Sequence, residues 1–271
     1  MTSYFKIGVL QILNIIAYAA MILVNGLADF LPINGQTTGE ISNQYTNLFV
    51  PAAVTFSIWL VIYSLLLMFC IYQGSTLFEA EKKEIDKKER VAQMLGYLFI
   101  LSCLLNISWI FAWHYHQLLV SVLIMLGLLY TLIRIFNILH AAHTYAGHKA
   151  RWFVYAPFSV YLGWISIATV ADIAAWLVSI GWNGWNIDEW IWACALIVVA
   201  VLLGMMMLIK KNNVFFAAVV VWALNGIMIR QYSASGGMNT VAITAMSGGI
   251  FLLILIVLNM KVKTPVHTPT L

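Results

Sequence analysis

The stretch YLGWISIATVAD, from Tyr161 to Asp172, lies inside an apolar run long enough for lipid to surround it. An apolar run of about 20 residues can cross a bilayer as a helix, so this stretch predicts a transmembrane helix. The same stretch ends on a carboxylate, and an ionisable group at that depth is costly and often functional. Asp172 is therefore the first candidate for a functional residue.

The rest of the chain has the same character. Of its 271 residues, 63% are hydrophobic and 9% are charged, whereas soluble domains contain about 25% charged residues. A membrane β-barrel is excluded, because its strands would be short and would alternate apolar and polar residues. We predict an all-α fold, a polytopic membrane bundle of about eight helices. The expected spans are 6–25, 51–73, 91–113, 117–140, 154–178, 190–209, 213–230 and 240–260.

The basic residues predict the orientation of these spans. Lys and Arg accumulate in cytoplasmic loops, and with the N-terminus inside, all of the 14 basic residues except Arg134 and Arg230 fall on the cytoplasmic side. We therefore expect both termini in the cytoplasm and a loop at 26–50 that faces outward. The expected location is a bacterial cytoplasmic membrane. The run at 79–90 mixes both signs of charge and is typical of a solvated connector. The expected partner is the lipid bilayer, and the net charge of +4 needs no nucleic acid to explain it.

Five expected helices carry a stripe of polar and aromatic residues on one face. Such faces turn inward in lipid, where they either form hydrogen bonds between helices or line a ligand pocket. Residues three, four, seven and eleven positions apart share a helix face. The stripes are Gln11, Asn14, Tyr18 and Asn25; Ala52, Phe56, Trp59 and Tyr63; Ser102, Asn106, Trp109 and Trp113; Tyr130, Arg134 and Asn137; and Pro157, Tyr161, Trp164, Ala168 and Asp172.

Asp172 and Arg134 are not expected to form a salt bridge. With a rise of 1.5 Å per residue, their depths in the membrane differ by roughly 18 Å. Arg134 is expected to extend its side chain to the cytoplasmic interface, and Asp172 needs hydrogen-bond donors, for which Asn14, Tyr18 and Asn106 are candidates. Asp172 either lines the polar end of a pocket or makes a buried bond between helices.

Three of the motifs resemble the TspO/MBR family, the tryptophan-rich sensory proteins related to the mitochondrial translocator protein. They are FVPAAVTFSIWLVIY in the second span, LLNISWIF in the third and YLGWISIATVAD in the fifth. They correspond to the F-x-P-P segment followed by Phe, Trp and Tyr, to L-N-x-x-W, and to P-Y-L-x-W followed by a small residue and an Asn. In this chain Ala52 replaces the second proline, Pro157 is separated from Tyr161, and Asp172 replaces the Asn.

The resemblance covers about residues 1–180 and implies a five-helix bundle there, with an additional three-helix membrane segment at 181–271. It also implies a small apolar or tetrapyrrole ligand, such as a porphyrin or haem, and a homodimer, with a sensory or carrier role and no required cofactor. The ligand-binding residues that we predict combine the resemblance with the stripes. They are Asn14, Tyr18, Pro51, Phe56, Trp59, Tyr63, Asn106, Trp109, Tyr161, Trp164, Ala168 and Asp172.

Two other functions stay open at this stage. A small-molecule transporter would use Arg134 and Asp172 to mark its pathway. A membrane enzyme acting on isoprenoid or porphyrin substrates would need an acid–base pair or a metal cluster, and only Asp172 and histidines such as His140 and His143 could contribute to one. We predict no catalytic residue and no metal ligand, and we leave an enzymatic role open.

Overall fold

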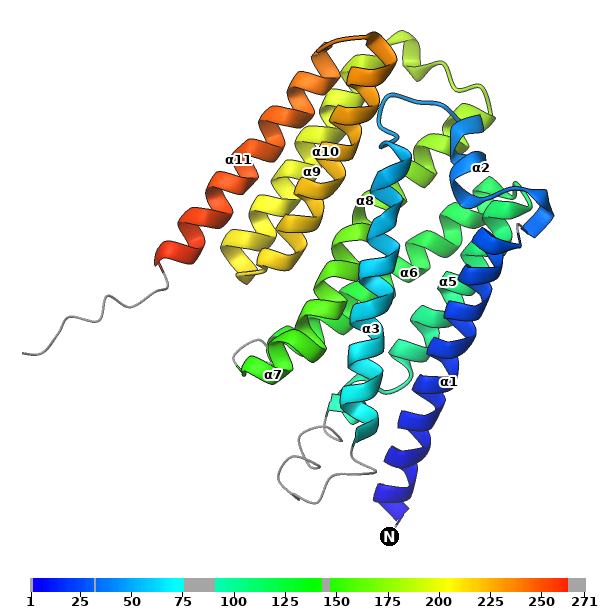
Figure 1. Cartoon of the computed structure of the whole chain (residues 1–271), viewed down its shortest axis with the longest axis vertical. Coiled ribbons are helices and arrows are strands. Elements are labelled where there is room, and N and C mark those ends of the chain that lie inside the picture. Colours follow the sequence, from blue (N-terminus) through cyan, green and yellow to red (C-terminus); the bar gives the residue numbers. More distant parts are fainter. Residues whose placement is uncertain (1, 32, 76–90, 143–146, 263–271) are drawn as a thin grey trace, which may run out of the picture. The chain divides into compact units, whose positions relative to one another are not determined.

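The computed structural model of the chain describes residues 2–31, 33–75, 91–142 and 147–262, and the regular elements in these ranges are helices (Figure 1). Seven of these helices are long and apolar enough to cross a membrane, which confirms the predicted all-α membrane fold. The connector at 79–90 and His143 lie outside the described residues. The long helices are α1 (Thr2–Phe30), α3 (Ile58–Gly74), α6 (Leu118–Ala141), α8 (Ala156–Ser179), α9 (Glu189–Lys211), α10 (Val214–Ser235) and α11 (Thr240–Val262).

The third predicted span is shorter than expected. Residues 91–95 are helical, but α5 begins only at Leu98 and ends at His114. Gly96 lies between the two helical pieces with a φ of 51°, a conformation that glycine adopts without steric cost because it has no Cβ. The prediction of one helix over 91–113 was wrong for this reason. The remaining short elements are η1 (Ile33–Gly35), α2 (Thr38–Gln44), η2 (Ala53–Ser57), α7 (His148–Ala150), η5 (Arg151–Tyr155) and η6 (Gly184–Asn186).

The chain forms two compact units. The first unit comprises residues 1–47 and 56–182, and the second comprises 48–55 and 183–271. From the sequence we expect a five-helix bundle over residues 1–180 and an additional segment over 181–271. Residues 48–55, which we call the strap, belong with the C-terminal helices although they precede α3 in the sequence.

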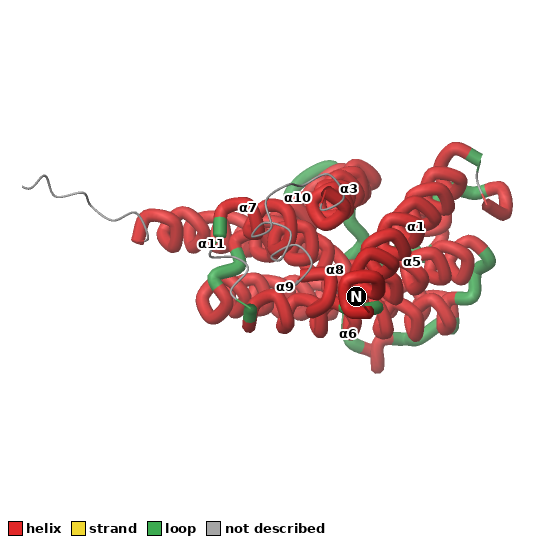
Figure 2. The backbone as a smooth tube through the Cα atoms, turned by 90° about the horizontal axis from the view of Figure 1, so that it is seen from below, coloured by secondary structure: helices red, strands yellow, loops and turns green. Residues whose placement is uncertain are grey.

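The long helices of the first unit form a closed ring. In this ring α3 contacts α1 and α8, α6 contacts α8 and α5, and α5 contacts α1. The end-on view in Figure 2 shows α1, α5, α6 and α8 side by side around this unit. A ring of five helices directs one face of each helix toward a common interior, which is where polar residues of membrane helices gather.

The stripes on α1, α5 and α8 are buried except at Ala168, as the periodicity predicts, with Asn14, Asn106 and Tyr161 fully inaccessible. The stripe on α6 was predicted to face inward, and this prediction was wrong. Tyr130 and Arg134 are exposed, and Arg134 Nη1 donates to Tyr130 Oη at 3.2 Å. The long arginine side chain keeps its charge out of the bundle interior, where its burial would be costly.

The second unit is a three-helix bundle in which α9, α10 and α11 all contact one another (Figure 1). Gly248 on α11 lies where the three helices meet. A Cβ at this position would come within 2.6 Å of the Val201 side chain on α9 and 3.5 Å of Leu224 on α10. Small residues allow membrane helices to approach closely and gain dispersion contacts, so this glycine stabilises the bundle by its lack of a side chain.

The first turn of α2 carries a capping box. The Thr37 hydroxyl accepts from the backbone N–H of Glu40, and the Glu40 carboxylate accepts from the backbone N–H of Thr37 at 2.7 Å. These hydrogen bonds from Thr37 stabilise the ionised carboxylate, so the pKa of Glu40 lies below its ordinary value. The capping box therefore stabilises the short helix α2 within the segment that connects α1 to the strap.

Candidate functional site

Aromatic side chains from three helices meet inside the first unit. Spacings of three and four residues place Phe56, in the η2 turn, on one face with Trp59 and Tyr63 at the start of α3. The same spacing aligns Tyr161 and Trp164 on α8. We call these residues, together with Trp109 on α5, the aromatic cluster.

Trp59 is the centre of the aromatic cluster. Its ring stacks on Tyr63 with centroids 5.5 Å apart and on Trp109 at 6.2 Å. It meets Tyr161 and Trp164 edge-on, each at 6.1 Å. These separations are those of favourable aromatic pairs, each contributing about 0.5–1.5 kcal/mol beyond the buried area. Trp59 itself is only half-buried, so its indole has an accessible surface.

A network of amides and phenols runs beside the aromatic cluster and joins four helices. Tyr63 Oη donates to Asn25 Oδ1 at 2.6 Å, and Asn25 Nδ2 donates to Asn106 Oδ1 at 2.7 Å. Asn106 Nδ2 in turn donates to Tyr161 Oη at 3.1 Å. Tyr18 joins the network by donating to the backbone carbonyl of Tyr63 at 2.8 Å. We call this set the amide–phenol network, and it locks the register of α1, α3, α5 and α8 around the aromatic cluster.

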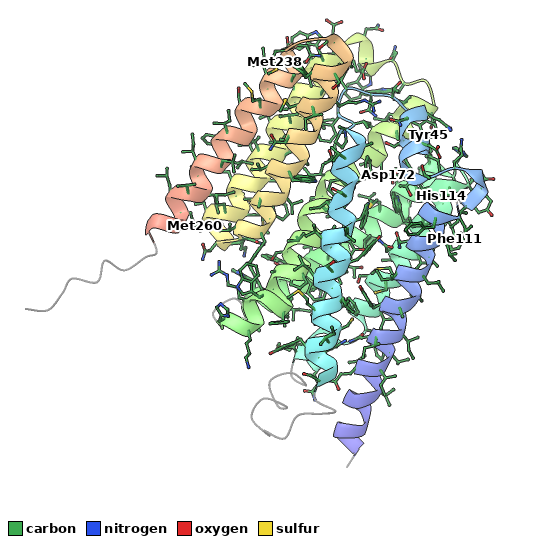
Figure 3. The ribbon with its side chains drawn as sticks, in the orientation of Figure 1. Tyr45, Phe111, His114, Asp172, Met238 and Met260 are labelled. Atoms are coloured by element: carbon green, nitrogen blue, oxygen red, sulfur yellow. The ribbon has the colours of Figure 1, made fainter. Side chains whose placement is uncertain are left out.

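Asp172 is buried, and its hydrogen-bond partner is a residue that we did not predict. Ser121 Oγ on α6 lies 3.0 and 3.1 Å from the two carboxylate oxygens of Asp172 and also 2.9 Å from the carbonyl of Leu118. The predicted neighbours Asn14, Tyr18 and Asn106 have other partners. Figure 3 shows Asp172 in the half of the bundle that also carries Tyr45 and His114.

The pair of Ser121 and Asp172 can accommodate either protonation state of the carboxyl group. If the group is ionised, the single hydroxyl proton of Ser121 is donated to it. If the group is neutral, its O–H can donate to Ser121 Oγ while the serine proton goes to the Leu118 carbonyl.

Replacing Ser121 by alanine is expected to lower the free energy of unfolding by about 1–3 kcal/mol, because it leaves a buried carboxyl group without its partner. Ser108→Ala is the matched control, since Ser108 donates to its own helix at Leu104 and is exposed. The measurement is unfolding in mixed micelles of a mild detergent and SDS. In an Asp172→Ala background the cost of Ser121→Ala should disappear. An equal cost in both backgrounds would show that the pair is not coupled.

Two indole N–H groups of the aromatic cluster are buried without a hydrogen-bond partner among the described residues. They belong to Trp164 and Trp109, whose side chains are 2% and 6% exposed. An unsatisfied buried donor costs about 1–3 kcal/mol. Both rings contact the half-buried ring of Trp59. Such donors are suited to a ligand that brings an acceptor to the aromatic cluster.

The α2 end of the bundle is closed by contacts that the sequence analysis missed. Tyr45 Oη lies 2.9 Å from His116 Nδ1, and His116 Nε2 lies 3.1 Å from Gln36 Oε1. The Tyr45 ring also contacts Trp113, which stacks on Trp109 of the aromatic cluster at 5.8 Å. Ring contacts therefore continue from α2 to Trp59. The sequence shows Tyr45 and His116 in loops between the predicted spans, but only the fold determines that these two residues pair.

Four predicted site residues are not joined to the aromatic cluster by a hydrogen bond of standard geometry or a ring contact, and Asp172, which bonds to Ser121, is one of them. Asn14 donates to Gln73 Oε1 at 2.9 Å and so links α1 to α3. Pro51 belongs to the strap, and Ala168 is a half-buried position on α8 between Trp164 and Asp172. Among the described residues, no group of three or more His, Cys, Asp or Glu side chains could hold a metal ion.

A family model described as TSPO-like protein matches residues 11–258. The chain belongs to the TSPO-like family. The match extends through α9, α10 and α11, beyond the residues 1–180 that carry the resemblance in sequence motifs. Searches of curated proteins and of solved structures gave no significant match.

Membership of the TSPO-like family and the apolar helices together make this chain an integral membrane protein. In this TSPO-like protein, residues of the three motifs form the aromatic cluster and contribute Asn106 and Tyr161 to the amide–phenol network. The network also depends on Asn25, which the stripe on α1 contained but which was not among the predicted site residues.

Proposed function

We propose that this TSPO-like protein binds a flat apolar ligand, of which a tetrapyrrole such as a porphyrin or haem is the favoured class, at the aromatic cluster. The observation that carries the proposal is the half-buried ring of Trp59 beside the unpartnered N–H group of Trp164. Aromatic faces suit a planar conjugated ring, and an indole N–H suits a carboxylate or carbonyl acceptor.

The proposed role is sensing or carriage, with both termini in the cytoplasm of a bacterial cell. The amide–phenol network supports a preformed site, because its hydrogen bonds join four helices of the protein to one another. A preformed site lowers the cost of ordering on binding. The proposal involves no chemical conversion of the ligand, and the residues of the cluster are assigned to binding only.

The transporter alternative depended on Arg134 and Asp172 as markers of one pathway. Arg134 is exposed and bonded to Tyr130, whereas Asp172 is buried and bonded to Ser121. A shared polar pathway would place both groups in the bundle interior. We therefore favour binding over transport.

Saturable binding of protoporphyrin IX and of haem to the purified protein is the expected result. The absorbance of the porphyrin should report it, because tryptophan variants change the emission of the protein itself. Trp164→Phe keeps an aromatic ring and removes the N–H, so we expect the affinity to fall roughly fivefold, equivalent to about 1 kcal/mol for one hydrogen bond.

Trp190→Phe is the matched control, because Trp190 is exposed and lies at the start of α9 in the second unit. Its affinity for protoporphyrin IX should equal that of the wild type. Non-saturable partitioning equal to that of an unrelated membrane protein would contradict the proposed function. Saturable binding that Trp164→Phe leaves unchanged would contradict only the role of the indole donor.

A further inference from the structure

The amide–phenol network of the first unit donates its hydrogen bonds in a fixed direction, and the backbone carbonyl of Met21 sets that direction. A carbonyl oxygen can only accept a hydrogen bond, and this one lies 2.8 Å from Asn25 Nδ2. If the Asn25 amide were flipped, its oxygen would face the Met21 carbonyl and two acceptors would repel each other. The side-chain oxygen of Asn25 therefore faces Tyr63, whose hydroxyl donates to it at 2.6 Å.

The fixed amide of Asn25 determines the next two bonds. Asn25 Nδ2 also donates to Asn106 Oδ1 at 2.7 Å, so Asn106 must present its oxygen to α1. The nitrogen of the same amide then faces α8, where it donates to Tyr161 Oη at 3.1 Å. An amide nitrogen is a donor only. Tyr161 is therefore the acceptor in this bond, and its own hydroxyl proton is left over.

The hydroxyl proton of Tyr161 has no acceptor within the described part of the chain, where the bond from Asn106 is the one hydrogen bond of this phenol. The side chain is completely buried, so bulk water supplies no acceptor either. A buried donor without a partner is costly and rare in folded proteins. The geometry therefore leaves a prepared donor at the end of the network.

This donor belongs to the aromatic cluster, because the Tyr161 ring meets Trp59 edge-on at 6.1 Å. Two further rings of the cluster, Trp109 and Trp164, also contact Trp59 and carry buried N–H groups without a partner among the described residues. Three rings around one indole thus carry unused donors of neutral charge. A ligand at the aromatic cluster meets these donors only if it carries hydrogen-bond acceptors.

We propose that Tyr161 is a specificity-determining residue, whose hydroxyl donates to an oxygen acceptor of the ligand together with the N–H groups of Trp109 and Trp164. The inference rests on the proposed function and narrows its ligand class to planar conjugated molecules that carry carboxylate or carbonyl oxygens. A site built to hydrogen-bond its ligand discriminates strongly against an analogue that lacks the matching group, because buried polar groups then stay unpaired.

Three porphyrins test this selection on the purified full-length protein. Protoporphyrin IX carries carboxylates, its dimethyl ester carries carbonyl oxygens without charge, and octaethylporphyrin carries no oxygen. By absorbance titration, the wild type should bind the ester about tenfold or more tighter than octaethylporphyrin. Tyr161→Phe keeps the ring and removes the hydroxyl, so it should reduce this ratio about fivefold, as expected for one hydrogen bond. Both affinities come from the same protein, so partial misfolding does not produce the effect.

The comparison with protoporphyrin IX identifies the kind of oxygen. An effect of Tyr161→Phe on both oxygen-bearing porphyrins would support recognition of either oxygen. An effect on only one of them would support the proposal and assign the acceptor to carboxylate or to carbonyl.

Tyr130→Phe is the matched control. Tyr130 also lies on a membrane helix of the first unit, and its oxygen also accepts one hydrogen bond, from Arg134 Nη1 at 3.2 Å. Its ring is exposed and has no contact with the aromatic cluster. The affinities for all three porphyrins, and therefore their ratios, should equal those of the wild type.

Raman spectra of the protein without ligand test the direction of the network separately. The intensity ratio of the tyrosine Fermi doublet distinguishes a hydroxyl that only accepts a hydrogen bond from one that donates. The difference spectrum between wild type and Tyr161→Phe should show a hydroxyl that only accepts. Saturation with the dimethyl ester should convert it to one that donates.

A donating Tyr161 hydroxyl in the protein without ligand would overturn the proposal, because no proton would be left for the ligand. An equal loss of affinity for the ester, protoporphyrin IX and octaethylporphyrin in Tyr161→Phe would overturn it as well, while the proposed function would stand. If the wild type binds none of the three saturably, the proposed function fails and recognition of an oxygen acceptor fails with it, whereas the difference spectrum still decides the direction of the network.

Discussion

Replacing Asn106 by leucine should lower the free energy of unfolding by about 2 kcal/mol. Asn106 is completely buried, and its amide links Asn25 on α1 to Tyr161 on α8. Leucine has nearly the same size, so the loss comes from two hydrogen bonds and not from a cavity. Bonds between membrane helices contribute on average about 0.6 kcal/mol and up to about 1.7 kcal/mol, and a polar group left unpaired adds to the cost.

Asn225→Leu provides the control for this experiment. Asn225 also lies on a transmembrane helix, and it donates to Val221 of the same helix at 2.9 Å. Its loss should change the free energy of unfolding by less than about 0.5 kcal/mol. The measurement is the unfolding midpoint and slope in mixed micelles with SDS. Equal effects of the two substitutions would mean that the amide–phenol network adds no stability between helices.

Replacing Trp59 by alanine should have the largest effect on ligand binding, a loss of affinity for protoporphyrin IX of roughly thirtyfold or more. Residues at the centre of a binding site commonly contribute 2 kcal/mol or more, and Trp59 contacts four aromatic rings. Its removal withdraws the stacking surface and also loosens Trp109 and Trp164. Trp59→Phe should lose much less, because it keeps an aromatic face in the same place.

Trp152→Ala separates this effect from general damage, because Trp152 also belongs to the first unit but is 46% exposed. Its affinity for protoporphyrin IX should match the wild type. The titration should be accompanied by an unfolding curve for each variant, so that a folded Trp59→Ala protein without binding can be recognised. Binding by folded Trp59→Ala at wild-type affinity would show that the aromatic cluster is not the ligand site.

The inward faces of α1, α5 and α8 could be predicted because helical periodicity needs only the sequence. Tyr161 and Asp172 both lie on such a face and both are buried. The periodicity of α6 failed because a stripe that includes Arg134 follows the same spacing whether it points into a bundle or away from it. Burial of a charge decides between the two, and the cost of that burial depends on which partners are present in the fold.

The partner of Asp172 could not be predicted for a related reason. Ser121 is an ordinary serine near the start of α6, and serine in a membrane helix commonly bonds to its own backbone. Only the relative register of α6 and α8 brings it to Asp172, and that register results from side-chain packing along both helices. The strap was missed because its apolar residues continue without a break into those of α3. The predicted span therefore began at Pro51, although α3 begins at Ile58.

The strap also has a consequence for the order of events during synthesis. Within the second unit, the carbonyl of Leu48 in the strap accepts from Gln231 Nε2 on α10, and these partners are 183 residues apart in the chain. At about 5–20 residues per second, the ribosome delivers the second partner on the order of ten to forty seconds after the first. During that interval α3, α5, α6 and α8 are made, while the strap still lacks its partners on α10. The last helices to be inserted therefore complete the assembly of a segment that was among the first to leave the ribosome.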